Sequence, residues 1–394
     1  MSVKDRACIV GIGTTTFYRR GGSGDTTELE LMCEATLKAV DDAGLSVDDI
    51  DGFSLYGGGY DTGMLSQTLG VPEVRYSVSM TGGGGGSQGT VANAAAAVAA
   101  GYAEVVLCVK ALKSGGPGGR RIGRAVERQG RAPAGGADAD FNHPFGLMSP
   151  GQAFALMARR HMEKYGTTTR HFGEVAVSTR FHASRNPAAL YRDPITLEDH
   201  EASRMIAEPL RLLDYCLETD GGTAVIVTSP ERARDLRQPP VYVMAAAQGG
   251  TGRWGQGIFW HQMPDEYYAS SGHRDVAKRL FAMAGIGPQD VDVAELYDHF
   301  TPLVIMQLED YGFCEIGEGG PFVEDGGIRW PDGRLPVNTH GGNLSEVYLL
   351  GLTHTIEAVR QMRGTSTSQV DGAEIALVTS GPGIMPTSAI LLHR

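Results

Sequence analysis

Two distant segments of the chain repeat one order of elements, and this repeat constrains the fold more than any local pattern does. The first segment has a glycine-rich loop over 82–86, a helix of small residues and an apolar strand over 103–109. The second has paired glycines at 341–342, a helix expected over 344–362 and an apolar strand over 373–378. Both strands begin with the pair Ala-Glu. Because self-similarity of this kind marks repeated structural units, the chain is predicted to consist of two duplicated halves.

The start of the chain alternates between strand and helix patterns. An apolar strand is predicted over 7–13, an amphipathic helix over 28–43 that stops at Gly44, and a second strand over 52–56. This strand–helix–strand spacing favours an α/β fold with a parallel sheet and covering helices. We therefore expect each half to have a βαβαβ core.

Changes in composition suggest where the halves divide. The segment over about 113–210 is rich in Arg, Gly and Ala at its start and is predicted to be a large insertion packed on the core. Residues 229–240 are polar and contain three prolines, which is typical of a connector. We assign residues 1–235 to an N-terminal half that includes the insertion, and residues 240–394 to a C-terminal half.

Charge and cysteine usage exclude several classes of protein. The net charge of −12 disfavours nucleic-acid binding, because phosphate binding needs a basic surface. The five cysteines lack the spacing of a zinc site or a disulfide framework, and no apolar run is long enough to span a membrane. The first ten residues show no pattern of a secretory signal. We expect a cytoplasmic protein with no metal, no cofactor of its own, and no membrane or nucleic-acid partner.

The glycine-rich loops do not fit a nucleotide site. The loop over 82–86 lacks the Gly-Lys-Ser/Thr ending of a phosphate loop, and Gly11-x-Gly13 lacks the third glycine of a dinucleotide fingerprint. Each loop precedes a predicted helix, however, and helix N-termini carry unpaired N–H groups and a positive dipole end. Two such ends facing one cleft would hold an oxyanion or an enolate.

Short motifs spread over nearly the whole chain carry a family resemblance. In chain order they are Val10-Gly11-Ile12-Gly13, His161–Thr168, Asn186-Pro187, Asp193–Thr196, Pro209-Leu210, Asp220-Gly221-Gly222, Glu295–Phe300 and Asn338–Gly342. Together they resemble the thiolase superfamily, specifically the sterol-carrier-protein-type thiolases and their thiolase-like lipid-transfer relatives. The resemblance implies the thiolase fold, with the duplicated halves layered α-β-α-β-α, a loop-domain insertion, and coenzyme A as part of the substrate.

The nucleophile of that family is missing from this chain. Thiolases place a cysteine at the start of the first glycine-flanked helix, and the matching position here is Gly84. The family's C-terminal Cys-x-Gly motif is Thr379-Ser380-Gly381, so the second catalytic cysteine is absent too. Since glycine offers no nucleophile, acyl-enzyme chemistry is predicted to be lost. The backbone N–H groups at Gly84 and Gly381 are predicted to hold an oxyanion or enolate.

Two further catalytic positions of the family have become tyrosine. The family's Asn-Glu-Ala-Phe motif is Tyr297–Phe300 here, and the histidine that follows its Asn-x-x-Gly-Gly motif is Tyr348. By the resemblance, Tyr297 and Tyr348 are a proton-handling pair. A tyrosine pKa of about 10 suits base catalysis poorly, so we expect a helix N-terminus near Tyr348 or a nearby histidine to favour the phenolate. The candidate supporting residues are Asp298, His299 and His340.

These replacements predict an aldolase. The resemblance extends to thiolase-like lipid-transfer proteins of steroid side-chain degradation, which are understood to be aldolases. We expect a retro-aldol carbon–carbon lyase that cleaves a bulky 3-hydroxyacyl-CoA, such as a 17-hydroxy steroid side-chain thioester. The products would be a ketone plus propionyl-CoA or acetyl-CoA.

Less specific interpretations stand beside each of these assignments. Both tyrosines could be core residues with paired hydroxyls. His340 could bond only a loop carbonyl, Asp298 could orient a turn, and Ser345 and Glu346 are expected to cap the helix that follows. The whole chain could also be a non-catalytic scaffold that binds acyl-CoA, or an acyltransferase with a nucleophile other than cysteine.

The resemblance also implies partners. Thiolases are dimers with sheets that run across the interface, so a homodimeric core is expected. Thiolase-like aldolases work with a small companion subunit that carries a zinc ribbon and an OB-fold, which would make a heterotetramer. An Arg-rich segment over 115–136 could contact coenzyme A phosphates or that companion, or could be a solvated loop.

Overall fold

The computed structural model describes residues 3–57, 61–80, 84–115, 143–250 and 267–394 of the chain. Its strands are β1 (Cys8–Thr14), β2 (Tyr18–Arg19), β3 (Gly52–Tyr56), β4 (Tyr76–Met80), β5 (Val105–Lys113), β6 (Met205–Ala207), β7 (Leu210–Arg211), β8 (Thr219–Thr228), β9 (Val241–Gly249), β10 (Val293–Glu295), β11 (Ile375–Ser380) and β12 (Thr387–His393). Its α-helices are α1 (Glu28–Ala43), α2 (Thr62–Leu69), α3 (Gly86–Ala100), α5 (Pro150–Tyr165), α6 (Thr169–Arg185), α7 (Leu197–Ala202), α8 (Pro230–Ala233), α9 (Arg274–Ala284), α10 (Thr301–Asp310), α11 (Gly319–Val323) and α12 (Leu352–Arg363).

The strand pairing shows the predicted duplication directly, but the expected parallel sheet is wrong, because most neighbouring strands of the sheet are antiparallel. In the first half, β3 runs parallel to β5, and β5, β8 and β1 then follow in antiparallel order. In the second half, β10 runs parallel to β11, and β11, β12 and β9 follow in antiparallel order. Only two residue pairs between β1 and β9 join the halves into one ten-stranded sheet. The exact boundaries at 235 and 240 stay a prediction.

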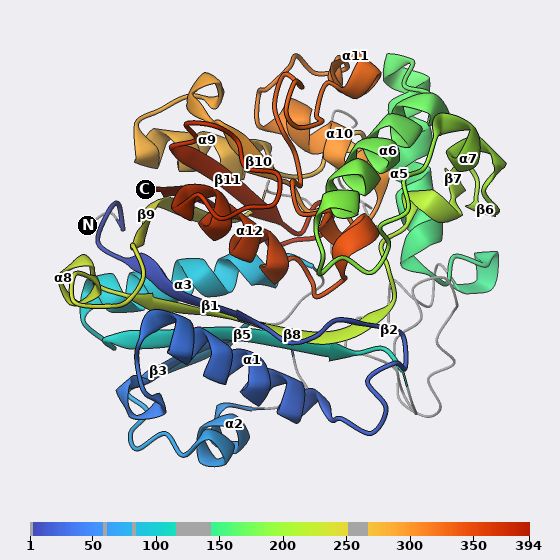
Figure 1. Cartoon of the computed structure of the whole chain (residues 1–394). Coiled ribbons are helices and arrows are strands. Elements are labelled where there is room, and N and C mark those ends of the chain that lie inside the picture. The colour runs from blue at the N-terminus through green and yellow to red at the C-terminus, as the bar shows by residue number, and fades with distance from the viewer. Residues whose placement is uncertain (1–2, 58–60, 81–83, 116–142, 251–266) are drawn as a thin grey trace.

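Helices and sheets alternate in layers, as expected for the thiolase fold (Figure 1). α3 and α12 lie in the middle and contact strands of both halves. α1 covers the outer face of the N-terminal strands, and α9 covers the outer face of the C-terminal strands. The two glycine-flanked helices are therefore neighbours at the centre of the molecule.

Local sequence explains how the first layer packs. Thr27 and Glu30 form a capping box at the start of α1, and Gly44 ends the helix in a left-handed conformation with φ +74°. A side chain at Gly11 or Gly13 would collide with backbone oxygens of α1 at 2.2 Å. The Gly-x-Gly pattern of β1 therefore serves close helix–strand packing and not dinucleotide binding.

One predicted helix is shorter than expected. The sequence suggested a helix over 344–362, but the structure has a π-type turn over Gly342–Glu346 and starts α12 only at Leu352. Gly341 and Gly342 have φ values of +108° and +55°, which prevents a regular helix start. Ser345 and Glu346 are consequently buried in this turn and do not cap α12, contrary to expectation.

The predicted insertion contributes to the core. Its helices α5, α6 and α7 lie together on one side of the molecule (Figure 1). Phe154 of α5 and Phe172 of α6 are buried in the same apolar cluster as Phe300 and Leu303 of the C-terminal half. The Arg-rich segment of 115–136 lies outside the described residues from position 116 onward.

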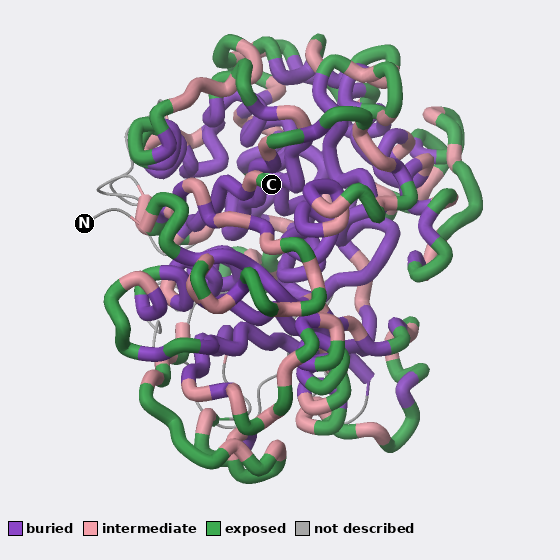
Figure 2. Tube along the Cα trace, turned by 60° about the vertical axis from the view of Figure 1, so that its left-hand side comes forward, coloured by how far each residue is buried: buried purple, intermediate pink, exposed green. Residues whose placement is uncertain are grey.

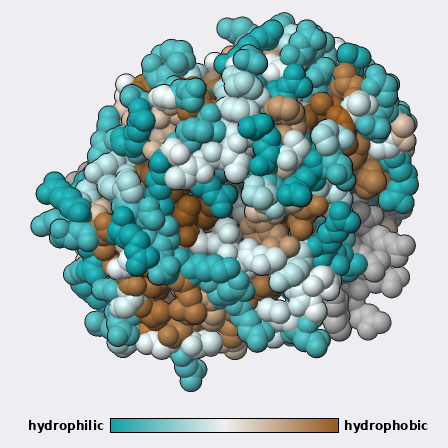
Figure 3. Space-filling model, viewed as in Figure 1, coloured by the Kyte–Doolittle hydropathy of each residue, from teal (hydrophilic) through white to brown (hydrophobic). Residues whose placement is uncertain are grey.

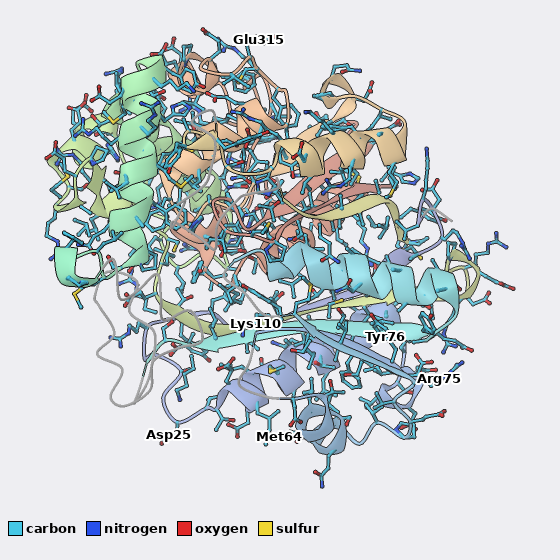
Figure 4. The ribbon with its side chains drawn as sticks, turned by 180° about the vertical axis from the view of Figure 1, so that it is seen from behind. Asp25, Met64, Arg75, Tyr76, Lys110 and Glu315 are labelled. Carbon is cyan, nitrogen blue, oxygen red and sulfur yellow. The ribbon has the colours of Figure 1, made fainter. Side chains whose placement is uncertain are left out.

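The surface is mixed, and buried residues form several apolar clusters across both halves. Buried chain runs through both halves, with exposed residues confined mainly to outer helices and loops (Figure 2). Apolar residues on the face seen in Figure 3 form separate patches among hydrophilic ones. At the edge of the sheet, Tyr76 of β4 stacks on Tyr102 with ring centroids 6.3 Å apart (Figure 4 labels Tyr76). Within the described ranges, no helix has the length and apolar character needed to cross a membrane.

Candidate active site

The two predicted tyrosines meet at the centre of the molecule. Tyr297 follows β10 and Tyr348 precedes α12, and their hydroxyl oxygens are 3.2 Å apart in a hydrogen bond. The backbone N–H of Tyr297 donates to Thr379 Oγ1 at 3.0 Å, and Gln307 Nε2 donates to the Tyr297 carbonyl at 2.9 Å. Thr219 bonds both the N–H and the carbonyl of Tyr348, at 3.1 and 2.9 Å. Both tyrosine backbones are thus fixed by side chains from neighbouring strands and helices.

A pocket opens in front of this pair. It brings five of the predicted site residues together: Gly84, Tyr297, His299, Tyr348 and Gly381. The other residues that line it are Pro150, Phe154, Cys216, Phe300, Pro382 and Ile384. The pocket therefore has a largely apolar wall with a few polar groups, which is the usual character of a small-molecule site.

The absence of a side chain at Gly84 leaves space for the phenol of Tyr297. Gly84 has φ +57°, and a Cβ at this position would lie 3.3 Å from the Tyr297 hydroxyl oxygen and 3.6 Å from the Gly381 Cα. A Cβ on Gly381 would in turn lie only 2.3 Å from the Gly85 Cα. The loss of the cysteine and the gain of the tyrosine are therefore structurally coupled, because a thiol-bearing side chain would occupy the space beside the phenol.

The surroundings of Tyr297 favour its protonated form over the tyrosinate. Burial raises the pKa of Tyr297 well above its ordinary value of about 10, and the neighbouring phenols of Tyr348 and Tyr56 raise it further. The expectation that the local field would favour the phenolate is therefore wrong for Tyr297. This residue keeps its proton at neutral pH and can donate it.

His299 lines the same pocket, and both of its ring nitrogens are buried. Its side chain is 7% exposed, and the ring packs edge-on against Phe154 at 4.5 Å and Tyr297 at 5.1 Å between centroids. Neither ring nitrogen has a hydrogen-bond partner among the described residues. Burial lowers the pKa of His299 to about 3, so the ring is neutral at physiological pH.

Asp298 and His340 lie behind the pocket and do not line it. The Asp298 carboxylate accepts the N–H of Asn343 at 2.8 Å and the Nε2–H of His354 at 3.1 Å. His340 is buried between two carboxylates, with Nδ1 2.9 Å from Glu295 and Nε2 3.6 Å from Glu346. Although burial opposes it, these glutamates raise the pKa of His340 to about 9. Both residues shape the two tyrosine-bearing segments.

Sequence reasoning did not find Cys216 or Phe154. Cys216 lies just before β8, where its backbone N–H donates to the His299 carbonyl at 3.0 Å. Phe154 comes from α5 in the insertion, so only the tertiary fold brings it to the pocket. Neither residue belongs to a recognisable motif. Within the described part of the chain, no cluster of three or more His, Cys, Asp or Glu side chains suits a metal ion.

The fold and the pocket define a thiolase-fold protein with Gly84 at the position of the family's nucleophile and Tyr297 and Tyr348 beside it. Residues 256–394 match the family described as "Thiolase C-terminal domain-like". The chain is 44% identical over 400 residues to a 17-hydroxy-3-oxo-4-pregnene-20-carboxyl-CoA lyase of Mycobacterium tuberculosis, covering 98% of this chain and 99% of that protein. It is 45% identical over 395 residues to a steroid side-chain-cleaving aldolase of Thermomonospora curvata, covering 98% and 97%.

A solved structure agrees with these sequence relatives. The structure titled "Ltp2-ChsH2(DUF35) aldolase" superposes with a TM-score of 0.90 at 43% identity, covering 100% of this chain and 99% of that one. The chain belongs to the thiolase superfamily, in the group of its thiolase-like steroid side-chain aldolases. The predicted family and fold are confirmed.

Proposed function

We propose that this chain is a retro-aldol carbon–carbon lyase that cleaves a bulky 3-hydroxyacyl-CoA into a ketone and a shorter acyl-CoA. One observation carries the proposal: the hydrogen-bonded pair Tyr297–Tyr348 faces Gly84, where the thiolase nucleophile would stand. The pocket therefore contains proton donors at the position where thiolases form a covalent bond. Such a site suits proton transfer without an acyl-enzyme intermediate.

The chemistry divides between the backbone and the phenols. Cleavage of the Cα–Cβ bond leaves an enolate on the thioester, and its negative oxygen needs hydrogen-bond donors. Gly84 and Gly381 line the pocket, and their backbone N–H groups are the proposed donors. A phenol of the tyrosine pair then supplies the proton to Cα, since Tyr297 retains its proton at neutral pH.

The relatives suggest the acyl group. The proteins from M. tuberculosis and T. curvata are named for a 17-hydroxy pregnene carboxyl-CoA and for steroid side-chain cleavage. A corresponding 17-hydroxy steroid side-chain thioester is the proposed substrate here, with propionyl-CoA or acetyl-CoA as the second product. Coenzyme A enters as part of the substrate, and no further cofactor is proposed.

Partners follow from the same comparison. The similar solved structure carries ChsH2(DUF35) in its title, which supports a small companion subunit for this chain. A zinc ribbon and OB-fold in that companion are our proposal. A homodimeric core is also proposed, and the position of β4 at the open end of the sheet would allow pairing there. Together these subunits would form a heterotetramer, which we place in the cytoplasm.

The test is product analysis. The full chain, alone and with a DUF35-type companion, is incubated with a 17-hydroxy steroid side-chain CoA thioester, and products are identified by mass spectrometry. Release of the 17-ketosteroid together with propionyl-CoA would support the lyase. Tight binding with no cleavage in either mixture would instead support the non-catalytic scaffold.

A further inference from the structure

A buried polar cluster at the start of α9 lies outside the pocket lining. Its members are Ser270, Ser271, His273, Arg274 and Asp310, and none of them lines the pocket. The Asp310 carboxylate accepts the Ser270 hydroxyl, the Ser271 N–H and the Arg274 Nε–H, each at 2.8 Å. A carboxylate is buried at tolerable cost only when it is paired and hydrogen-bonded, as here. Asp310 therefore fixes the backbone over 270–274.

This cluster contacts the loop that follows β11. His273 Nε2 lies 3.2 Å from the carbonyl oxygen of Ser380, and because a carbonyl can only accept, Nε2 carries the proton. The carbonyl of Ser271 accepts the Gly383 N–H at 2.7 Å. Gly381, which lines the pocket, lies between these two contacts. The segment before α9 therefore holds the loop on both sides of Gly381.

The Ser380 carbonyl and the Gly381 N–H belong to one peptide unit. In the described structure the cis peptide bonds all precede proline, so this unit is trans. A planar trans peptide places its carbonyl oxygen and its amide hydrogen on opposite sides of the bond. The bond from His273 to the carbonyl therefore directs the Gly381 N–H away from His273. A donor at the carbonyl also polarises the peptide, which makes its N–H a stronger donor.

The direction of this peptide needs such a contact. The pairing of β11 with β12 ends at Ser380 and Ser388, and Gly381 has a φ of +82°. A Cβ at Gly381 would lie 2.3 Å from the Gly85 Cα, so the close approach of the two loops requires glycine. Since glycine has the widest conformational freedom, a side chain from outside the strand is needed to fix its amide.

We propose that His273 is a positioning residue of this chain: its Nε2–H holds the Ser380–Gly381 peptide so that the Gly381 N–H donates to the enolate oxygen of the acyl-CoA. This inference rests on the proposed lyase function and concerns how one of its enolate donors is held. His273 itself does not contact the substrate, and no proton moves to or from its ring during the reaction.

Two substitutions separate the hydrogen bond from the packing of the ring. The full chain with its companion subunit is prepared as His273→Leu, which removes the donor, and as His273→Gln, whose amide N–H can replace the Nε2–H. Leu280→Val is the control for lost stability, because Leu280 is fully buried on the same helix and has no polar side-chain atom.

The expected changes in kcat follow from the role of one donor. We expect kcat to fall by roughly 10-fold to 100-fold in His273→Leu and by less than about threefold in His273→Gln. The loss is partial because the proposed donor at Gly84 remains. Leu280→Val should keep the wild-type kcat at a temperature where the protein is folded.

A pair of ligands reports on the donor itself. A nitronate analogue of propionyl-CoA has a negatively charged oxygen in place of the enolate oxygen, and a thioether analogue has no oxygen there. In His273→Leu the affinity for the nitronate should fall by about the same factor as kcat, while the affinity for the thioether stays at the wild-type value. Isothermal titration calorimetry measures both affinities. General damage to the pocket would weaken both ligands together.

The outcomes separate the two proposals. Wild-type kcat in a folded His273→Leu protein would overturn the positioning role, and so would an equal loss of affinity for the two analogues. A folded His273→Gln protein as slow as His273→Leu would also count against the hydrogen bond. A wild-type protein that binds the steroid thioester without cleaving it would refute the lyase function itself. Selective loss of nitronate affinity in His273→Leu, largely restored in His273→Gln, is the result expected if both proposals hold.

Discussion

The two sides of one short loop serve opposite purposes. Tyr297 and His299 face the pocket, where they are uncharged and His299 has no polar partner among the described residues. Asp298, between them, points the other way and bonds the backbone of Asn343 and the ring of His354. The front of the loop presents uncharged groups to the pocket, and the back uses the Asp298 carboxylate to hold the neighbouring backbone. If the proposed function is right, this contrast separates groups that meet the substrate from groups that position them.

The back of the site connects both tyrosines through one histidine. Glu295 lies two residues before Tyr297, and Glu346 lies two residues before Tyr348. His340 sits between these glutamates, at 2.9 and 3.6 Å. One buried histidine therefore contacts a carboxylate two residues before each tyrosine, which links the two tyrosine-bearing segments.

The largest effect is expected on the front side. Tyr297→Phe and Tyr348→Phe each remove one hydroxyl of the pair that is 3.2 Å apart. We expect kcat to fall by roughly 100-fold to 10,000-fold in each, the range of general acid–base catalysis, with little change in substrate binding. Steady-state kinetics on the steroid thioester would measure this.

Tyr311→Phe is the matched control for these variants. Tyr311 is 1% exposed, its hydroxyl has no hydrogen-bond partner in the described structure, and it packs in the apolar core on His273 and Phe281. Its activity should equal wild type. If both active-site phenylalanine variants kept more than a third of the wild-type kcat, the tyrosine pair would have no part in the chemistry.

A smaller loss is expected where the two halves meet at Gly84. Gly84→Ala would place a methyl group 3.3 Å from the Tyr297 hydroxyl at a φ of +57°. We expect kcat to drop by roughly 10-fold to 100-fold, since displacement of reacting groups by about 1 Å has effects of this size.

Gly101→Ala separates backbone strain from the effect on the pocket. Gly101 also has a left-handed φ, +75°, but a Cβ there would have no neighbour within 4 Å. This control should lose some stability and keep full kcat. Equal losses of kcat in both alanine variants would mean that strain, and not contact with Tyr297, limits the enzyme.

His340, behind the pocket, should contribute to the free energy of unfolding in a way that depends on pH. The folded-state pKa of His340, about 9, exceeds the unfolded value of about 6.5, because Glu346 and Glu295 outweigh the effect of burial. Its contribution to stability is therefore complete below pH 6.5 and is lost as the pH rises toward 9. His340→Gln should cost about 3–5 kcal/mol at pH 6, as expected when one partner of a buried ion pair is removed.

Denaturant unfolding of both proteins between pH 6 and 9 measures this difference. The gap between wild type and His340→Gln should narrow as the pH rises. The control His393→Gln removes only a partly exposed ion pair with Asp5, so it should differ from wild type by less than about 1 kcal/mol at every pH. A gap that stays constant with pH would contradict a charged His340. The loss of kcat in His340→Gln should be smaller than in the tyrosine variants, because the histidine acts only through their positions.

The sequence predicts those residues of the site that belong to recognisable motifs. Gly84, Tyr297 and Tyr348 fall at positions of family motifs, so the sequence alone predicts that they share one site. The turn over Gly342–Glu346 was missed because its shape depends on Asp298, which is distant in sequence, and on glycines with positive φ. Periodicity within 344–362 contains no information about such a contact, so the helix was extended too far.

The sequence does not predict the pocket residues that lie outside these motifs. Phe154 arrives from an inserted helix and Cys216 from the loop before β8, and their proximity results from packing between segments far apart in sequence. The sequence also gives the wrong direction for the pKa of Tyr297, for the same reason. The pKa of Tyr297 depends on complete burial and on three neighbouring groups, Tyr348, Tyr56 and Cys216, that no linear pattern reveals.

The smallest effect is expected at Cys216, and it bears on the remaining acyltransferase alternative. This cysteine lines the pocket, so it is the residue that could replace the missing thiolase nucleophile. If the site works by proton transfer alone, Cys216→Ser should change the activation free energy by less than about 1 kcal/mol, or roughly fivefold in kcat. Intact-protein mass spectrometry during turnover should detect no acyl adduct. A thioester on Cys216, together with complete inactivity of the serine variant, would indicate a covalent acyl-transfer mechanism. Tyr297 and His299 would then only support that reaction.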